Sequence, residues 1–368
     1  MTIIVNKQLD KLQEWLVKEE LDMAFINEPN TIAYLSGYES DPHERILALA
    51  VFATEEPFLF TPELEKGDAL KSEWPHAVYG YLDNEDPWSL IAHHLNSRKS
   101  DLNSIAIEKD FLTVGRFEKL QSYFSAGSFL DITPKIQSMK LIKTPEEIDK
   151  MMEAGKWADR AFEIGFNAIK EGISEEEIVA EIEYHLKKEG IKEMSFETMV
   201  LTGDNAASPH GTPGKRQVQS NEFVLFDLGV IYNGYTSDAT RTIAFGEPSK
   251  QAKEIYAIVL EAYHAALSAV KPGITAGELD RLARDVITKA GYGPYFTHRL
   301  GHGLGSSVHE FPSIMQDSGF VIQEGMCFSI EPGIYLPGVA GVRIEDCVVV
   351  TKDGCKVFTH TPNVYTSI

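Results

Sequence analysis

The chain has 368 residues, 43% of them hydrophobic and 24% charged, which is enough material for two folded globular domains. Its formal charge of −21 at pH 7 argues against a nucleic-acid-binding surface, because such surfaces gather Lys and Arg against phosphates. The apolar runs are too short to cross a bilayer, and the first residues lack the apolar core of a secretory signal. Cys327, Cys347 and Cys355 have no metal-binding spacing, so we expect reduced thiols in a cytoplasmic protein.

Residues 1–138 alternate between helical and strand-like patterns. In the first helical pattern, 7–20, Leu9, Leu12 and Leu16 recur on one face. Further helices are expected at 87–95 and 114–123, and strands at 24–26, 45–52, 57–60 and 104–108. This alternation predicts a small α/β domain.

Residues 139–368 are predicted to form a second domain of the α+β class. Thr144 followed by Pro145 is typical of a helix N-terminus, since Pro is favoured at the first helical position. Long helices are expected at about 146–170 and 250–270.

This second domain contains an internal repeat. Gly172–Ile178 recurs 101 positions later as Gly273–Leu279, and each copy carries a capping box that begins a helix. Gly190 and Gly291, offset by the same amount, are expected to end these helices as glycine C-caps. A hairpin-like region follows each copy, so we predict two helix–helix–sheet halves with helices on one face of an antiparallel sheet. Chance similarity between two common helix signals is the alternative.

A hairpin in the first half brings two aspartates together. The dipeptide at 233–234, Asn-Gly, is typical of a two-residue β-turn and is flanked by strand-like runs. Such a turn pairs Asp227 with Thr240 and leaves Asp238 two positions along on the same face, at diagonal-neighbour distance. The two carboxylates can then converge on ions between them, although a bulge in either strand would change this register.

The histidines of the second half gather in a glycine-rich segment. His298, His302 and His309 fall within twelve residues, although the chain has only 11 histidines. Glycines around His302 let the backbone approach a site closely. This clustering favours a functional site over three unrelated structural histidines.

Two glutamates complete a set of four carboxylates and one imidazole. Glu331 and Glu345 lie in apolar, strand-like runs, 326–335 and 342–351, where either could instead be the salt-bridge partner of Arg343. Four buried carboxylates cannot all stay ionised without compensating positive charge, which two divalent cations would supply. Ligands that are mostly oxygen suit Mn²⁺ and its neighbours better than a Cys-rich zinc site would.

Several short segments carry these residues in a recognisable order. They are His210-Gly211, Asp227-x-Gly229, Ser237-Asp238-x-Thr240-Arg241, Gly301-His302-Gly303, His309-Glu310, Ser329-Ile330-Glu331-Pro332-Gly333 and Arg343-x-Glu345-Asp346. The set resembles the pita-bread metallopeptidases, the family of prolidases, aminopeptidases P and methionine aminopeptidases. Residues 28–38 resemble the creatinase-like domain of prolidases, which methionine aminopeptidases lack. The resemblance implies a pita-bread domain preceded by a smaller α/β creatinase-like domain.

The resemblance also implies roles for the metal-binding residues. Asp227 would bind one ion, His302 and Glu331 the other, and Asp238 and Glu345 would bridge both. The expected cofactor is two divalent ions, Mn²⁺ with Co²⁺ or Zn²⁺ as alternatives, which would activate a water for attack on a peptide carbonyl. The resemblance further implies that the protein forms a homodimer.

Five residues are expected to act with the ions. Glu331 is the candidate for proton transfer. His210, His298 and His309 resemble the histidines of the family that orient substrate and stabilise the tetrahedral intermediate. Arg343 is expected to hold Asp238 or its neighbours through a buried ion pair.

Substrate recognition departs from several prolidases, which carry an Arg shortly after the His-Glu pair. Here 311–314 reads Phe-Pro-Ser-Ile, so Arg299, beside His298, is the substitute candidate for gripping a substrate carboxylate. The further substrate-binding candidates are Tyr235, Arg343, His43 and Arg45. The last two belong to a loop that, in homodimers of this kind, reaches the active site of the second subunit.

We therefore predict a cytoplasmic Xaa-Pro dipeptidase that acts on small peptides and binds neither nucleic acid nor membrane. The nearest alternative is an aminopeptidase P that trims longer Xaa-Pro peptides. Creatinase-like C–N hydrolysis and a non-catalytic binding module share the fold, but the intact ligand set argues against both.

Overall fold

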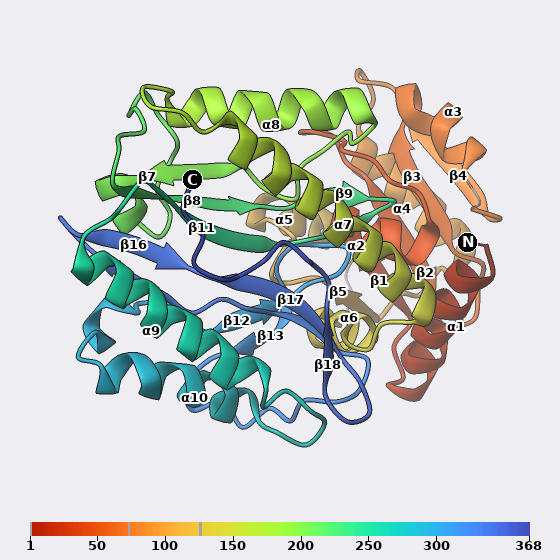
Figure 1. Cartoon of the computed structure of the whole chain (residues 1–368). Coiled ribbons are helices and arrows are strands. Elements are labelled where there is room, and N and C mark those ends of the chain that lie inside the picture. Colours follow the sequence, from red (N-terminus) through yellow and green to blue (C-terminus); the bar gives the residue numbers. More distant parts are fainter. Residues whose placement is uncertain (1, 73, 125–126) are drawn as a thin grey trace. The chain divides into compact units, whose positions relative to one another are not determined.

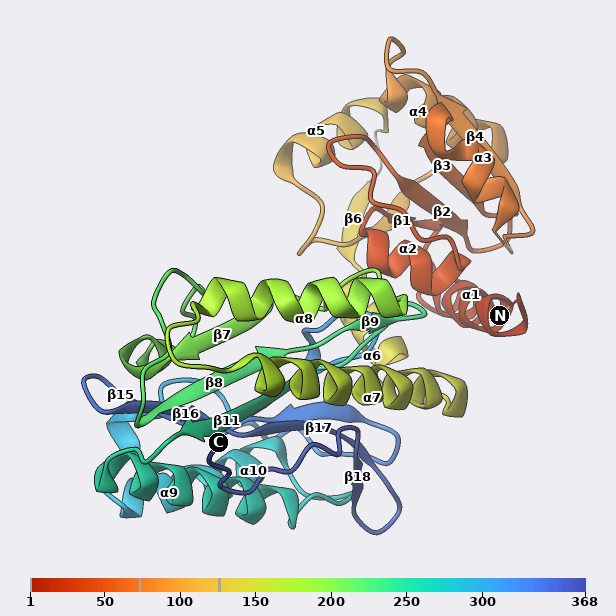
Figure 2. The ribbon, with the colours of Figure 1, turned by 45° about the horizontal axis from the view of Figure 1, so that its top comes forward.

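The computed structural model describes residues 2–72, 74–124 and 127–368, with side chains described from Lys7 onward. By its internal contacts the chain divides into two compact units, Met1–Met139 and Lys140–Ile368. Figures 1 and 2 show the elements of each unit from two directions. Within the described ranges, no helix is both long and apolar enough to cross a membrane.

The N-terminal unit is built on one mixed sheet with the strand order β4-β3-β2-β1-β5-β6. Its strands are β1 (Met23–Ile26), β2 (Ala48–Phe52), β3 (Phe58–Pro62), β4 (Ala77–Tyr81), β5 (Ser104–Ile107) and β6 (Ser128–Asp131). Its helices are α1 (Thr2–Lys18), α2 (Pro29–Ser36), α3 (Glu63–Lys71), α4 (Pro87–Arg98), α5 (Val114–Tyr123) and α6 (Thr133–Leu141), which ends just past the boundary. Alternate residues of β1 enter two different apolar clusters, so the sheet is covered on both faces.

The predicted helices and strands of this unit are present. The first helix starts at Thr2 rather than at residue 7, and its apolar face, Leu9, Leu12 and Leu16, is buried as expected. Sequence reasoning missed α2, α3, α6, β4 and β6, which are short and carry weak apolar periodicity. One overlooked signal was Glu28, whose side chain caps α2 by accepting backbone N–H groups.

The C-terminal unit begins with a capped helix. Thr144 and Glu147 form a capping box with Pro145 at the first helical position, which confirms the predicted start. The helices of this unit are α7 (Pro145–Ala168), α8 (Glu175–Glu189), η1 (Gly203–Ala207), α9 (Lys250–Leu267), α10 (Ala276–Lys289) and η2 (Gly293–Tyr295).

The helix signals of the repeat are largely confirmed. Both α8 and α10 begin with the predicted capping boxes. Gly190 is the C-cap of α8, with a left-handed φ of 106°. The prediction for Gly291 was one position wrong, because α10 ends at Lys289 with Ala290 as its C-cap, and Gly291 follows.

The large sheet of this unit is antiparallel throughout, with the order β13-β12-β14-β17-β11-β8-β7, and β18 paired to β17. The strands of the unit are β7 (Met199–Thr202), β8 (Glu222–Leu228), β9 (Ile231–Tyr232), β10 (Tyr235–Thr236), β11 (Ala239–Phe245), β12 (Gly301–Gly303), β13 (Glu310–Ile314), β14 (Cys327–Ile330), β15 (Gly333–Leu336), β16 (Ala340–Arg343), β17 (Glu345–Val350) and β18 (Cys355–Val357). Outward from the β11–β17 junction, one half has the order β11-β8-β7 and the other the order β17-β14-β12, so the two halves mirror each other. This arrangement supports an internal duplication over a chance likeness of helix caps.

Both helix pairs cover the same face of this sheet. In β8, Val224 and Phe226 join an apolar cluster with α7 and α8. In β17, Val348 and Val350 join a cluster with α9 and α10, and Figure 2 shows each helix pair side by side. Because side chains alternate along a strand, the neighbours of these residues, including Asp227 next to Phe226, face the other side of the sheet. Asp227 and Glu345 therefore lie on the face opposite the helices, here called the polar face, which also carries small apolar clusters around Leu225 and Cys347.

The predicted hairpin register is confirmed. Tyr232 pairs with Tyr235 across the turn, and Asp227 pairs with Thr240. Asn233 and Gly234 both have positive φ, 48° and 78°, as a type I′ turn requires.

Two runs predicted as continuous strands are each divided. The run 326–335 forms β14 and β15, which belong to different sheets, and Glu331 lies in the break before Pro332. The run 342–351 is divided in the same way between β16 and β17, at Ile344. Pro332 lacks the N–H that a central strand needs, so the chain leaves the sheet there.

Candidate metal centre

A cavity of about 370 Å³ opens on the polar face of the large sheet. Ten of the residues predicted for the site line it, namely His210, Asp227, Asp238, His298, Arg299, His302, His309, Glu331, Arg343 and Glu345. They come from four strands, β8, β12, β16 and β17, and from the segments between strands, so the site forms only when the domain is folded. A volume of this size suits a small ligand.

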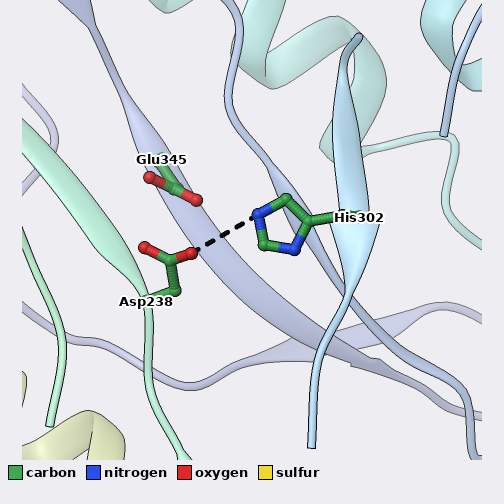
Figure 3. Close-up of side chains that lie close together, drawn as sticks. All are labelled: Asp238, His302 and Glu345. Carbon is green, nitrogen blue, oxygen red and sulfur yellow. Dashed lines mark ion pairs between the residues drawn. The ribbon is translucent and has the colours of Figure 1, made fainter. Parts of the chain in front are cut away.

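Three of these side chains meet closely enough to share one cation. Asp238, His302 and Glu345 are buried, and one ligand atom from each lies within 4.8 Å of the others. Figure 3 shows their polar ends turned toward one another, with His302 Nε2 3.5 Å from Asp238 Oδ2. Glu331 is adjacent, with its Oε1 3.3 Å from His302 Nε2.

The hydrogen bond made by His302 Nδ1 leaves Nε2 as the ring nitrogen that can bind a metal. His302 Nδ1 lies 3.1 Å from the carbonyl oxygen of Gly303, which can only accept a hydrogen bond. Nδ1 therefore carries a ring proton, and Nε2 faces the carboxylates of Asp238 and Glu331. Burial opposes the charge, but these two carboxylates raise the pKa of His302, and a cation bound there would replace the Nε2 proton. A metal-binding histidine is usually oriented by a hydrogen bond that its other ring N–H donates, for example to a backbone carbonyl.

Asp227 is held by Arg343 from the opposite side of the cavity. Arg343 Nη2 donates to Asp227 Oδ2 at 2.5 Å, so the ion pair expected for Arg343 forms with Asp227 and not with Asp238. The contact spans 116 residues of sequence, and nothing in the local pattern distinguishes the two aspartates as partners.

Two carboxylate oxygens in the cavity are buried without a partner. Asp227 Oδ1 and Glu345 Oε1 have no hydrogen-bond partner in the part of the chain that the structure describes. A buried, unsatisfied oxygen is destabilising, and a divalent cation is the partner that several converging carboxylates accept best. The donor set of carboxylate oxygens and one imidazole nitrogen thus fits a divalent metal.

The electrostatics of the cavity agree with this assignment. Burial raises the pKa of Asp227 above its ordinary value, although the charge of Arg343 opposes the shift. Burial also raises the pKa of Asp238 to about 7 and that of Glu345 well above its ordinary range. These carboxylates favour protons because the cavity offers them too little positive charge, which bound cations would supply.

His298 belongs to a hydrogen-bonded chain that includes Tyr335, a residue that sequence reasoning missed. His298 Nδ1 lies 2.7 Å from the carbonyl of Arg299, so its Nε2 accepts from the Tyr335 hydroxyl at 2.9 Å. The Tyr335 hydroxyl in turn accepts from Arg343 Nη1 at 2.8 Å. Burial lowers the pKa of His298 and raises that of Tyr335 to about 12, which keeps this proton order near neutral pH.

His309 and His210 lie at the more open side of the cavity. The His309 ring centroid is 4.3 Å from that of His302, and its surroundings lower the pKa of His309 to about 4, chiefly by desolvation. The next residue, Glu310, forms a buried ion pair of 2.8 Å with Lys143, which holds the loop in place. His210 is exposed and follows η1.

Of the substrate-binding candidates Arg299 and Tyr235, only the first lines the cavity. Arg299 lines the cavity and donates from Nη1 to Ser313 Oγ at 2.7 Å. Tyr235 does not line the cavity, because its ring packs toward α7 and its hydroxyl donates to Glu147 at 2.8 Å. The part of Tyr235 in substrate binding stays a prediction.

His43 and Arg45 belong to the N-terminal unit. Arg45 forms a two-point ion pair with Asp83, at 2.8 and 3.0 Å, and His43 is exposed with a positive φ of 53°. Their part in substrate binding stays a prediction.

The remaining cavity wall was not predicted. It is formed by residues of two segments around β7 and η1, chiefly Phe196, Glu197, Met199, Pro209, Thr212 and Pro213. These segments carry no regular apolar periodicity, and Glu197 has no neighbouring motif that marks it, so only their fold reveals them. A proline-rich approach to His210 was the one available signal.

Known protein families match almost the whole chain. Residues 149–352 match metallopeptidase family M24, and residues 8–142 match the creatinase/prolidase N-terminal domain. An Xaa-Pro dipeptidase from Lactobacillus helveticus is 56% identical over 355 residues, which cover 96% of each chain.

Solved structures share the architecture. An Xaa-Pro dipeptidase from Bacillus anthracis is similar with a TM-score of 0.91 and 32% identity, covering 99% of this chain and 100% of that one. An X-Pro aminopeptidase from Thermotoga maritima is similar with a TM-score of 0.85 and 31% identity, covering 95% and 98%. These matches confirm the predicted α+β pita-bread fold with its α/β creatinase-like N-terminal domain. The chain therefore belongs to metallopeptidase family M24, whose members are hydrolases that depend on divalent metal ions.

Proposed function

We propose that this protein hydrolyses the peptide bond before proline in Xaa-Pro dipeptides. The observation that carries the proposal is the convergence of Asp238, His302 and Glu345 in a cavity sized for a small ligand. The Lactobacillus helveticus relative, named Xaa-Pro dipeptidase, supports the choice of substrate. We assign residues 1–138 to the creatinase-like domain and 139–368 to the catalytic domain.

We propose that the cavity binds two divalent ions, with Mn²⁺ as the first choice. Asp227 would bind one ion, His302 and Glu331 the other, and Asp238 and Glu345 would bridge them. The unpartnered oxygens of Asp227 and Glu345 support this assignment. When bound, such ions polarise a carbonyl and generate a nucleophile from water near neutral pH.

The side chains around the ions have separate tasks. We assign proton transfer to Glu331, which its hydrogen bond from Ser329 Oγ at 3.0 Å and its position beside His302 support. His210 and His309, at the open side, would contact the substrate and stabilise the charge of the tetrahedral intermediate. His298, engaged with Tyr335, is assigned to orienting that wall of the cavity.

The protein is proposed to be a cytoplasmic homodimer. Three free cysteines, of which Cys327 and Cys347 are buried, are in keeping with a reducing compartment. Sedimentation of the purified protein tests the dimer directly, and a monomer at all concentrations would remove the predicted role of His43 and Arg45 in a second subunit.

Proline specificity is tested by comparing Leu-Pro with Leu-Ala after loading with Mn²⁺. The proline nitrogen has no hydrogen to donate, so a site made for it need not provide an acceptor there. We expect turnover of Leu-Pro to exceed that of Leu-Ala by at least about 100-fold, because a matched site rejects an unpaired polar group strongly. Comparable rates on both dipeptides would contradict the proposed specificity.

The second candidate is an aminopeptidase that releases one residue from longer Xaa-Pro peptides. The likeness to the Thermotoga maritima X-Pro aminopeptidase favours it. A Leu-Pro-Pro tripeptide in the same assay separates the two, since a dipeptidase needs the free carboxylate next to proline and an aminopeptidase does not.

Replacing Arg299 by alanine is expected to raise KM for Leu-Pro about tenfold or more, with unchanged metal content. The guanidinium lies in the cavity wall beside Ser313, where it can grip a substrate carboxylate, and a charge-assisted bond contributes about 1.5–3 kcal/mol. Leu-Pro-amide, which lacks that carboxylate, should lose much less. Arg281→Ala, on an exposed turn of α10, is the matched control. Equal losses on the acid and the amide would make Arg299 structural and favour the aminopeptidase.

A further inference from the structure

Thr240 lies between two of the proposed metal ligands. On β11 it pairs with Asp227 of β8 on one side and with Glu345 of β17 on the other. Residues paired across antiparallel strands point to the same face, so all three face the cavity side of the sheet. The side chain of Thr240 is fully buried. Valine has nearly the same shape and would fit a buried strand. A buried hydroxyl at this position is costly unless it forms hydrogen bonds, so its partners indicate its role.

The direction of both hydrogen bonds to the Thr240 hydroxyl is determined by chemistry. Arg343 Nε lies 2.9 Å from Thr240 Oγ1, and because a guanidinium has no acceptor, Arg343 is the donor. The hydroxyl has a single hydrogen. With Glu345 ionised, as a metal ligand must be, that hydrogen points to Glu345 Oε2, 2.7 Å away.

This bond leaves one oxygen of Glu345 for another partner. Oε2 is engaged by Thr240, and Oε1 is one of the two unpartnered oxygens of the cavity. Asp227 shows the same division, because Arg343 Nη2 engages Oδ2 and leaves Oδ1 unpartnered. One guanidinium thus orients both carboxylates, Asp227 directly and Glu345 through the Thr240 hydroxyl.

We propose that Thr240 is a positioning residue for the metal centre, whose hydroxyl relays the orientation imposed by Arg343 to Glu345 and thereby raises the affinity for divalent ions. The inference rests on the proposed assignment of Glu345 as a ligand. Without the hydroxyl, Arg343 Nε loses its acceptor and Glu345 loses the donor that holds Oε2. Residues that orient a ligand in this way typically change metal affinity by about 10- to 100-fold.

The test is the affinity for Mn²⁺, measured by titration calorimetry on chelator-treated protein. Thr240→Val keeps the shape and removes the hydroxyl, and we expect it to weaken Mn²⁺ binding about 10- to 100-fold. Thr240→Ser keeps the hydroxyl and should restore an affinity close to that of the wild type. Activity of Thr240→Val should rise again at Mn²⁺ concentrations that saturate the weakened site.

Thr242→Val provides the matched control. Thr242 lies on the same strand and face and is also buried. Among the described residues its hydroxyl is hydrogen-bonded only to the backbone of Arg343, donating to O at 2.9 Å and accepting from N at 3.3 Å. Its loss removes an equally buried hydroxyl beside the same arginine but touches no carboxylate. We expect its Mn²⁺ affinity to stay close to that of the wild type.

The outcomes separate the inference from the proposed function. Wild-type affinity for Mn²⁺ in Thr240→Val, or an equal loss in Thr242→Val, would overturn the positioning role while leaving the metal centre intact. If the wild type itself binds no divalent ion, the proposed function fails first. Should Thr240→Val not fold, Thr240→Ala is measured instead, with the same loss expected and unchanged affinity again counting against the proposal.

Discussion

Replacing Asp238 by asparagine is expected to reduce turnover of Leu-Pro by at least about 100-fold while the protein still folds. Asp238 lies at the centre of the cluster with His302 and Glu345, and the proposal makes it a ligand of both ions. An amide offers one oxygen instead of two and carries no charge, so a single substitution weakens both ions together. Glu345→Gln should behave in the same way for the same reason.

Both variants are judged on metal content as well as rate. Elemental analysis should find less than the full complement of metal, and circular dichroism should find a native fold. Glu222→Gln is the matched control, since this carboxylate also lies on a strand of the large sheet but pairs with Arg216 outside the cavity. Near wild-type rates with two ions bound in Asp238→Asn would show that the ligand assignment is wrong.

Removing the metal is expected to abolish activity and to lower the melting temperature. A ligand that binds only the folded state stabilises it by about 2.7 kcal/mol at 100 times its dissociation constant. The free carboxylates also lose their compensating charge and repel one another. Dialysis against a chelator, followed by thermal unfolding with and without added Mn²⁺, measures both effects. Full activity in excess chelator with no bound metal would exclude the mechanism.

The stability of the metal-free protein should fall as the pH rises from about 4 to 7. Burial raises the pKa of Asp238 from an ordinary 3.8 to about 7, and that of Glu345 is raised as well. Between these two values the folded state binds more protons than the unfolded state, so each increase in pH favours unfolding. In the metal-loaded protein these carboxylates stay ionised as ligands, so its stability does not fall in this way as the pH rises.

The difference in melting temperature between loaded and chelated protein should therefore widen from pH 5 to pH 8. Melting curves at several pH values in this range provide the measurement. A difference that narrows as the pH rises would contradict the raised pKa of Asp238.

Much of the site was available from short-range patterns. The Asn233-Gly234 turn determined the pairing of Asp227 with Thr240, because a two-residue turn allows only one register. Capping boxes determined where α8 and α10 begin, since the bonds join residues three positions apart. Residue types that bind divalent ions, several of them in apolar strand-like runs, indicated the metal centre before any fold was known.

The orientation of the ligands depended on contacts that no local pattern contains. Arg343 forms its ion pair with Asp227 and not with Asp238, and Thr240 donates a hydrogen bond to Glu345. Each contact joins residues more than 100 positions apart in the sequence. Tyr335 reaches His298 because the chain leaves the large sheet after β14 and forms β15, a strand of a separate sheet. Tyr235, expected in the site, packs instead against α7.

The sequence by itself thus determined the chemistry of the centre, its hairpin and its repeated architecture, because turns, caps and strand alternation act over a few residues. Only the tertiary structure decided which oxygen of each carboxylate is engaged and which is left for a cation. That choice depends on how strands from both halves of the repeat align at the β11–β17 junction, and the burial of many distant residues sets this alignment.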